Sequence, residues 1–180
     1  MMVDPALSRK WVYWTLFLVL AGLMFFMRLI PLQTTPSNWA MPDLLVCMCF
    51  AWVLRRPDYT PVLLIAAVML LADMLFQRPP GLMAALVVIG TEFLRRRTHL
   101  MRELPFMFEW AMVAGVMVAM LIAYRLVLIV VMQPRPSFWL SMTLLISTIA
   151  AYPLVVAFSR YVLGVRKIAP GEVDELGHRI

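Results

Sequence analysis

Five ionisable residues lie within or at the edges of long apolar runs of this 180-residue chain: Asp43, Asp73, Glu92, Glu109 and Arg125. An ionisable side chain in apolar surroundings is costly unless it pairs with an opposite charge or reaches a wet cavity. The chemistry open to these residues is therefore ion pairing or the capture of a polar partner.

The residue types needed for catalysis are scarce. His99 and His178 both fall outside the apolar runs, so the spans have no residues for a His-Glu-x-x-His zinc site or a Ser/His protease site. The sequence has no glycine-rich phosphate loop. Cys47 and Cys49 are two positions apart, which turns them to roughly opposite sides of a helix and disfavours a mutual disulfide. We therefore expect no catalytic residue, no metal site and no cofactor.

The apolar runs are too extensive for a soluble core. Hydrophobic residues make up 63% of the chain, charged residues 14%, and the mean hydropathy is +0.87. One soluble core of this length cannot hide so much apolar surface, so we expect membrane lipid around most of the chain. The net charge of +6 is first a topology signal in such a protein, and we expect no nucleic-acid partner.

Apolar runs separated by helix breakers predict one domain of six transmembrane helices, residues 1–168, followed by a polar cytoplasmic tail, residues 169–180. The second and fourth spans are short, with about fifteen residues each, so tilted re-entrant elements are the alternative to full crossing. The first is expected to stay as an uncleaved span because no small-residue cleavage site follows it, and Pro153 is expected to kink the last. The spans cover residues 11–30, 39–54, 60–76, 81–94, 105–132 and 137–163.

The basic residues set the expected orientation. Twelve of the sixteen Lys and Arg fall in the N-terminal tail, the second and fourth connections and the C-terminal end. Three fall in the other connections, and Arg125 lies within a span. Because basic residues stay on the cytoplasmic side, both termini of this expected inner-membrane protein are expected in the cytoplasm.

Counting along the expected helices brings charged residues from three spans to one level. Asp73 lies about 20 Å from the inner start of the third span, and Arg125 lies about 30 Å along the fifth. Asp43 stands at the outer start of the second span. We expect Asp73 and Arg125, with Asp43 or Arg28 close by, to form an outward-facing polar cluster. The alternative is that each side chain reaches the outer surface independently.

The other two carboxylates have basic neighbours in the sequence. Glu92 is expected to pair with Arg95 or Arg96, one turn away on the same helix. Glu109 lies one turn into the fifth span and is expected at the membrane interface beside Arg102.

Two proline-containing segments are expected to make tight turns. Residues 79–81, Pro-Pro-Gly, predict a rigid outer turn because two fixed φ angles followed by glycine cannot continue a helix. Residues 55–58, Arg-Arg-Pro-Asp, predict the equivalent turn on the inner side. Topology alone accounts for its two arginines, with contacts to anionic lipid headgroups or to a cytoplasmic partner as the alternative.

Four short motifs then carry a family resemblance. In order and spacing they resemble MreD, the bacterial rod-shape-determining membrane protein family, and the length, six-span layout and basic connections of the chain are similar too. The chain departs from the family at residues 77–79, Gln-Arg-Pro, where the family more often has glycine and a smaller turn. The motifs are Pro42-Asp43-Leu44-Leu45, Trp52 with Arg55-Arg56-Pro57, Leu70-Leu71-Ala72-Asp73, and Pro80-Gly81-Leu82 with Ala84-Ala85-Leu86.

The resemblance implies an all-α fold similar to the membrane-embedded substrate-binding subunits of energy-coupling-factor vitamin transporters. It also implies a non-enzymatic component of the elongasome, which supports peptidoglycan synthesis with MreC, the MreB filament, RodA and a penicillin-binding transpeptidase. The alternatives are a small-molecule-binding subunit of a transporter and, third, a lipid-modifying enzyme. The residues that match by position are Pro42, Asp43, Arg56, Pro57, Asp73 and Gly81, to which the charge argument adds Arg125.

Overall fold

The computed structural model describes residues 5–30, 40–102 and 104–165, and the predicted tail 169–180 lies outside them. The described residues are all-helical, with seven α-helices and one 3-10 helix. The helices are α1 (Pro5–Leu29), α2 (Leu44–Arg55), η1 (Pro57–Tyr59), α3 (Val62–Leu75), α4 (Leu82–Arg96), α5 (Thr98–Arg102), α6 (Phe106–Val130) and α7 (Phe138–Tyr161).

Three helices in the described ranges are long and apolar enough to cross a membrane: Lys10–Leu29 within α1, and the whole of α6 and α7. Each of the other predicted spans also contains a helix, but these are shorter. Helices α2, α3 and α4 have 12, 14 and 15 residues. At a rise of 1.5 Å per residue they extend about 18 to 23 Å, less than the roughly 30 Å of a hydrocarbon core.

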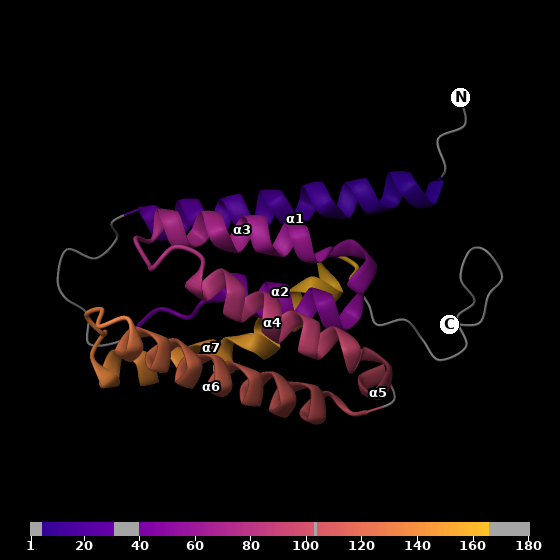
Figure 1. The fold of residues 1–180 in the computed structure, drawn as a ribbon. Helices are drawn as coiled ribbons and strands as arrows, with labels where there is room; N and C mark the ends of the chain where they lie inside the picture. The colour runs from indigo at the N-terminus through magenta and orange to yellow at the C-terminus, as the bar shows by residue number, and fades with distance from the viewer. Residues whose placement is uncertain (1–4, 31–39, 103, 166–180) are drawn as a thin grey trace.

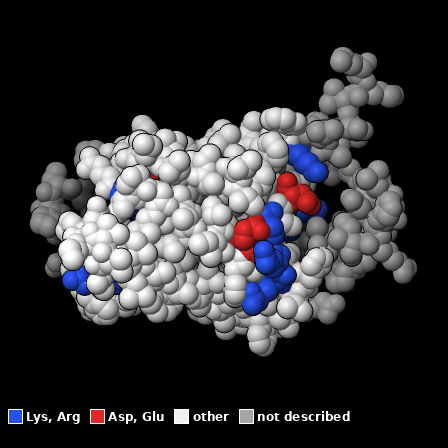
Figure 2. Space-filling model, viewed as in Figure 1, with Lys and Arg blue, Asp and Glu red and all other residues white. Residues whose placement is uncertain are grey.

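The helices lie side by side in a bundle and alternate in direction (Figure 1). The start of α1 and the end of α7 lie at the same end, together with η1 and α5. The ends of α1, α3 and α6 lie at the opposite end. Lys and Arg side chains gather with acidic ones at the end that carries the start of α1, which we call the basic end (Figure 2).

Helix α2 is the centre of the bundle. Eleven of its twelve residues are buried, and it packs against α4 and α7. A helix enclosed by other helices must be apolar on every side, and its sequence, LLVCMCFAWVLR, has no charged residue before the last position. The helix of the second predicted span, which is the shortest helix of the six spans, therefore occupies the most enclosed position of the bundle.

Helix α1 contacts the bundle through one narrow stripe. Tyr13, Phe17, Ala21 and Phe25 recur every fourth residue and face η1, α2 and α3, while the opposite side of the helix is exposed. The stripe makes four aromatic contacts, with ring centroids 4.1 Å apart for Tyr13–Tyr59, 6.3 Å for Tyr13–Trp52, 5.4 Å for Phe17–Trp52 and 5.9 Å for Phe25–Phe76.

Helix α4 packs between α3 and α6, and Gly90 lies where α4 approaches α2 and α6 closely. A Cβ atom at Gly90 would lie 3.1 Å from Val116, 3.2 Å from Phe50 and 3.3 Å from Met120. Those distances are shorter than ordinary van der Waals contact, so a larger residue would require these three side chains to shift by a few tenths of an ångström.

The turn between α3 and α4 uses two left-handed residues. Gln77 has φ 52° after the end of α3, where the Arg78 amide donates to the Asp73 carbonyl (3.0 Å) and the Gln77 amide donates to the Met74 carbonyl (3.4 Å). This pair of bonds is a Schellman motif, which normally places glycine at the left-handed position. Gly81, at φ 83°, then begins α4. Gln77 therefore carries a side chain at a left-handed position where glycine is normally favoured.

Candidate functional site

Asp43 is the carboxylate that gathers the cations at the end of the bundle opposite the basic end. Its Oδ2 accepts hydrogen bonds from Arg28 Nη1 (3.3 Å) and Arg78 Nη2 (3.2 Å), although the residue is only 5% exposed. Both guanidinium groups also lie over the ring of Phe76, at 4.8 and 5.4 Å from its centroid. The connection after α3, the end of α1 and the start of α2 are therefore joined by one charge cluster, in which Asp43 is buried and the two arginines are half-buried.

The segment that leads into α2 is held by hydroxyl groups of α7. The Ala40 amide donates to Thr143 Oγ1 (3.4 Å), Ser147 Oγ donates to the Ala40 carbonyl (3.2 Å), and the Asp43 amide donates to Thr148 Oγ1 (3.0 Å). Pro42, between them, has no amide hydrogen to satisfy. These bonds supply the partners that a non-helical backbone needs when it is enclosed by protein.

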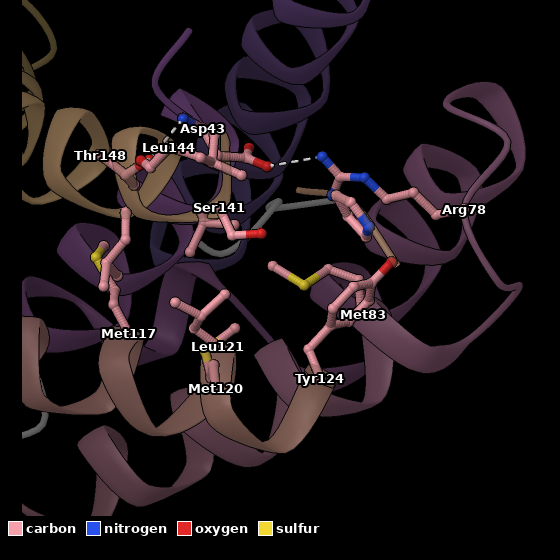
Figure 3. Close-up of a pocket in the computed structure, with 13 residues that line it drawn as sticks. Asp43, Arg78, Met83, Met117, Met120, Leu121, Tyr124, Ser141, Leu144 and Thr148 are labelled. Carbon is pink, nitrogen blue, oxygen red and sulfur yellow. Dashed lines mark hydrogen bonds and ion pairs between the residues drawn. The ribbon is translucent and has the colours of Figure 1, made fainter. Parts of the chain in front are cut away.

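A cavity of about 230 Å³ opens beside the cluster, between α2, α4, α6 and α7. Figure 3 shows Asp43 and Arg78 facing each other at one side, while methionine and leucine side chains extend into the cavity from the helices. The lining combines one ion pair with a largely apolar wall that includes flexible methionines. Such a lining suits a ligand or a peptide that has both a charged or polar group and an apolar part. The lining residues are Asp43, Val46, Arg78, Met83, Met117, Met120, Leu121, Tyr124, Pro136, Ser141, Leu144, Leu145 and Thr148.

The expected pairing of Asp73 with Arg125 is wrong. Asp73 Oδ2 accepts the backbone amide of Ala84 (3.1 Å), in the first turn of α4. Arg125 Nη2 donates to the Pro136 carbonyl (2.8 Å), and its guanidinium lies over the Phe138 ring (5.1 Å). Asp73 therefore acts as a capping group for α4, whose own N-cap residue is a glycine without a side chain.

The remaining predicted residues, Arg56 and Pro57, lie at the basic end. Arg56 follows α2, and its guanidinium lies 5.7 Å from the centroid of the Tyr59 ring. The Pro57 carbonyl accepts Arg95 Nη1 (2.9 Å), and the Thr60 carbonyl accepts Arg95 Nη2 (2.6 Å). Arg95 also pairs with Glu92 at 2.8 Å, as the sequence predicted, so a single arginine of α4 holds the turn between α2 and α3.

A second buried charge cluster was not predicted. Glu109 is fully buried, its Oε1 lies 3.0 Å from Arg55 Nη1, and the Tyr152 hydroxyl donates to the same oxygen (2.9 Å). Glu109 therefore has protein partners on α2 and α7 that the sequence did not predict, and its expected level at the membrane interface stays a prediction. The apolar run of α2 continues to Arg55, and the breaker Pro57 comes only two residues later, so the sequence contained a signal that Arg55 belongs to the helix.

A groove runs along the surface between α4 and α6, with a volume of about 440 Å³. Its floor on α6 is made by small residues at every fourth position, Gly115, Ala119 and Ala123, and no atom lies within 4 Å of a Cβ placed on Gly115. Small residues at this spacing allow another helix to approach closely within a membrane. We call this surface the α4–α6 groove. It is lined by Leu86, Ile89, Gly90, Phe93, Met112, Gly115, Val116, Ala119, Met120 and Ala123.

Comparisons of the chain with protein-family models, with curated proteins and with solved structures found no match.

Proposed function

We propose that this chain is a non-enzymatic integral membrane protein that assembles with another membrane protein, with six helices that cross the bilayer and both termini in the cytoplasm. The support for membrane insertion is the combination of three long apolar helices with three shorter ones packed between or beside them. The basic end would face the cytoplasm, because Lys and Arg concentrate there and basic segments resist translocation.

The short central helix fits this arrangement because the segment before it extends the crossing. Helix α2 extends about 18 Å, which is less than a hydrocarbon core of roughly 30 Å, and the non-helical residues 40–43 before it lengthen the segment. Non-helical backbone is tolerated at such depth only where protein satisfies its polar groups. The hydroxyl groups of Thr143, Ser147 and Thr148 do this for Ala40 and Asp43.

The α4–α6 groove carries the proposed assembly role. Its lining is apolar, it lies on a helix of 25 residues that can cross a membrane, and its glycine and alanines leave room for close backbone approach. Helices associate in lipid through such packing rather than through hydrophobic burial. The fitting occupant is the transmembrane helix of a single-span partner.

The resemblance to MreD suggests which partner and which process are involved. We propose that the partner is MreC and that the fold is similar to that of energy-coupling-factor substrate-binding subunits. The complex would help to position cell-wall synthesis together with the MreB filament, RodA and a penicillin-binding transpeptidase. Residues of three of the four motifs hold the fold together: Asp43 joins three segments, and Asp73 and Gly81 lie at the start of α4.

Partner capture from native membranes tests the proposal. The wild-type chain is expected to co-purify with a single-span protein in a fixed ratio, and its depletion is expected to give round cells. Gly115→Leu should reduce capture at least about tenfold because it fills the groove floor. Gly22→Leu is the matched control, because a Cβ placed on Gly22 likewise has no atom within 4 Å, but this glycine lies on α1, away from the groove. Equal capture by the two variants would contradict the groove as the binding surface.

The cavity beside Asp43 favours a second candidate, a small-molecule-binding subunit of a transporter. Its volume of about 230 Å³ and its mixture of an ion pair with apolar walls suit a small ligand. This alternative requires saturable, specific uptake of one small molecule in membranes that also contain an energising partner. A chain that gives no such uptake but captures a single-span protein would be an assembly protein.

A further inference from the structure

A second cavity, of about 510 Å³, lies at the basic end between α6 and α7 beside the end of α2. We call it the basic-end cavity. Its lining combines charged residues with apolar ones, among them Phe106, Pro153 and Val156. The cavity is lined by Arg55, Phe106, Glu109, Pro153, Val156, Ala157, Arg160 and Tyr161.

Of the two arginines that line this cavity, one has no ion-pair partner in the described part of the chain. Arg55 is 6% exposed and its Nη1 pairs with Glu109, so that cation already has a protein partner. Arg160 is exposed in the last turn of α7, and no carboxylate in the described part of the chain lies within ion-pair distance of it. Its guanidinium lies 5.6 Å from the ring centroid of the exposed Tyr161. The two arginines against one glutamate give the cavity a net positive charge.

We propose that the basic-end cavity binds the phosphate group of an anionic phospholipid from the leaflet that faces the cytoplasm. Arg160 would donate charge-assisted hydrogen bonds to the phosphate. Arg55 would not bind it directly but would add to the positive electrostatic potential of the cavity. The apolar lining residues Phe106, Val156 and Ala157 would contact the glycerol and the first part of the acyl chains.

The position of the cavity selects a lipid over a free phosphate. Arg160 and Tyr161 end a helix that is long enough to span a membrane, which places them at headgroup level in the proposed orientation. The inference rests on the proposed membrane orientation. A free phosphate is negatively charged, as the headgroup of an anionic lipid is. It has no apolar group that could contact the apolar residues of the cavity.

Native mass spectrometry of the full chain in detergent tests the lipid site, with dioleoylphosphatidylglycerol, dioleoylphosphatidylcholine and inorganic phosphate as separate probes. We expect wild-type protein to bind the anionic lipid about fivefold to tenfold more tightly than the zwitterionic one. Arg160→Gln should remove that preference. Arg96→Gln is the matched control, because Arg96 is an exposed arginine of the same end that does not line the cavity.

Three results would overturn the lipid site. The first is an unchanged lipid preference in Arg160→Gln, and the second is an equal loss in Arg96→Gln, which would indicate a general charge effect. The third is inorganic phosphate binding as tightly as the anionic lipid. Thermal unfolding of each variant in zwitterionic nanodiscs checks that Arg160→Gln is folded. Because partner capture depends on Gly115 instead, a failed lipid site with intact capture would leave the proposed function standing.

Discussion

The indole Nε1 of Trp110 on α6 donates a hydrogen bond of 2.9 Å to the carbonyl oxygen of Ile149 on α7. Ile149 lies four residues before Pro153, which has no amide hydrogen, so this carbonyl has lost the donor that a regular helix would provide. Trp110 therefore supplies across the helix interface what Pro153 removes within the helix.

This relationship predicts that the cost of losing the indole donor depends on the proline. Trp110→Phe should lower the free energy of unfolding by about 0.5 to 2 kcal/mol, because the Ile149 carbonyl is left unpaired. In a Pro153→Ala background the new amide can serve that carbonyl, and the same change should cost clearly less. Thermal unfolding in detergent, arranged as a double-mutant cycle, measures the difference. An identical cost in both backgrounds would show that the carbonyl does not depend on Trp110.

The buried pair of Arg55 and Glu109 predicts an asymmetric response to neutralisation. Arg55→Met leaves a buried carboxylate without its cation and should cost about 3 to 5 kcal/mol, seen as a loss of folded yield. Adding Glu109→Gln should recover most of that yield. The surface change Arg96→Met is the control and should have little effect. A double variant no better than Arg55→Met alone would argue against the pair as the source of the loss.

Asp73 is predicted to act on α4 and not on Arg125. Asp73→Ala should cost about 1 kcal/mol by removing the cap from the Ala84 amide, and Asp73→Asn should cost less because it keeps an oxygen acceptor. Charge reversal at Asp73 and Arg125 together should be no better than the worse single reversal. Folded yield, measured by size-exclusion chromatography, checks both points. A higher yield in the double reversal than in either single reversal would show that Asp73 and Arg125 do pair directly.

The left-handed residues of the α3–α4 turn predict two opposite changes. Gln77→Gly should raise the free energy of unfolding by about 1 kcal/mol, because glycine adopts φ 52° without the Cβ penalty. Gly81→Ala, at φ 83°, should lower it by a similar amount. Thermal midpoints of the two variants, measured side by side, should therefore move apart. A lower midpoint for Gln77→Gly would contradict the assignment of strain.

The sequence predicted how far along its helix each charged residue lies better than it predicted which neighbouring helix its side chain faces. Counting 1.5 Å per residue placed Asp43, Asp73 and Arg125 toward one end of the bundle, where the structure has them. It did not predict which of them meet, because the rotation of each helix about its own axis depends on packing with its neighbours. Arg28 and Arg78 thus turned out to surround Asp43.

The same reason explains Glu109. Its position one turn into α6 was correct, but only the packing of α6 against α7 turns it toward Arg55 and Tyr152. Contacts within a single helix, such as Glu92 with Arg95, were predictable because helical spacing alone brings those side chains together. Contacts between helices were not.

The orientation of the bundle across a membrane is tested most directly by cysteine labelling in intact cells. Gln133, in the connection between α6 and α7, and His99, on α5, are both exposed and lie at opposite ends. The native Cys47 and Cys49 are fully buried, so the unaltered chain serves as the blank. A membrane-impermeant maleimide should label Gln133→Cys in intact cells and should label His99→Cys only after the cells are opened. Labelling of His99→Cys in intact cells, or protection of Gln133→Cys, would contradict the proposed orientation.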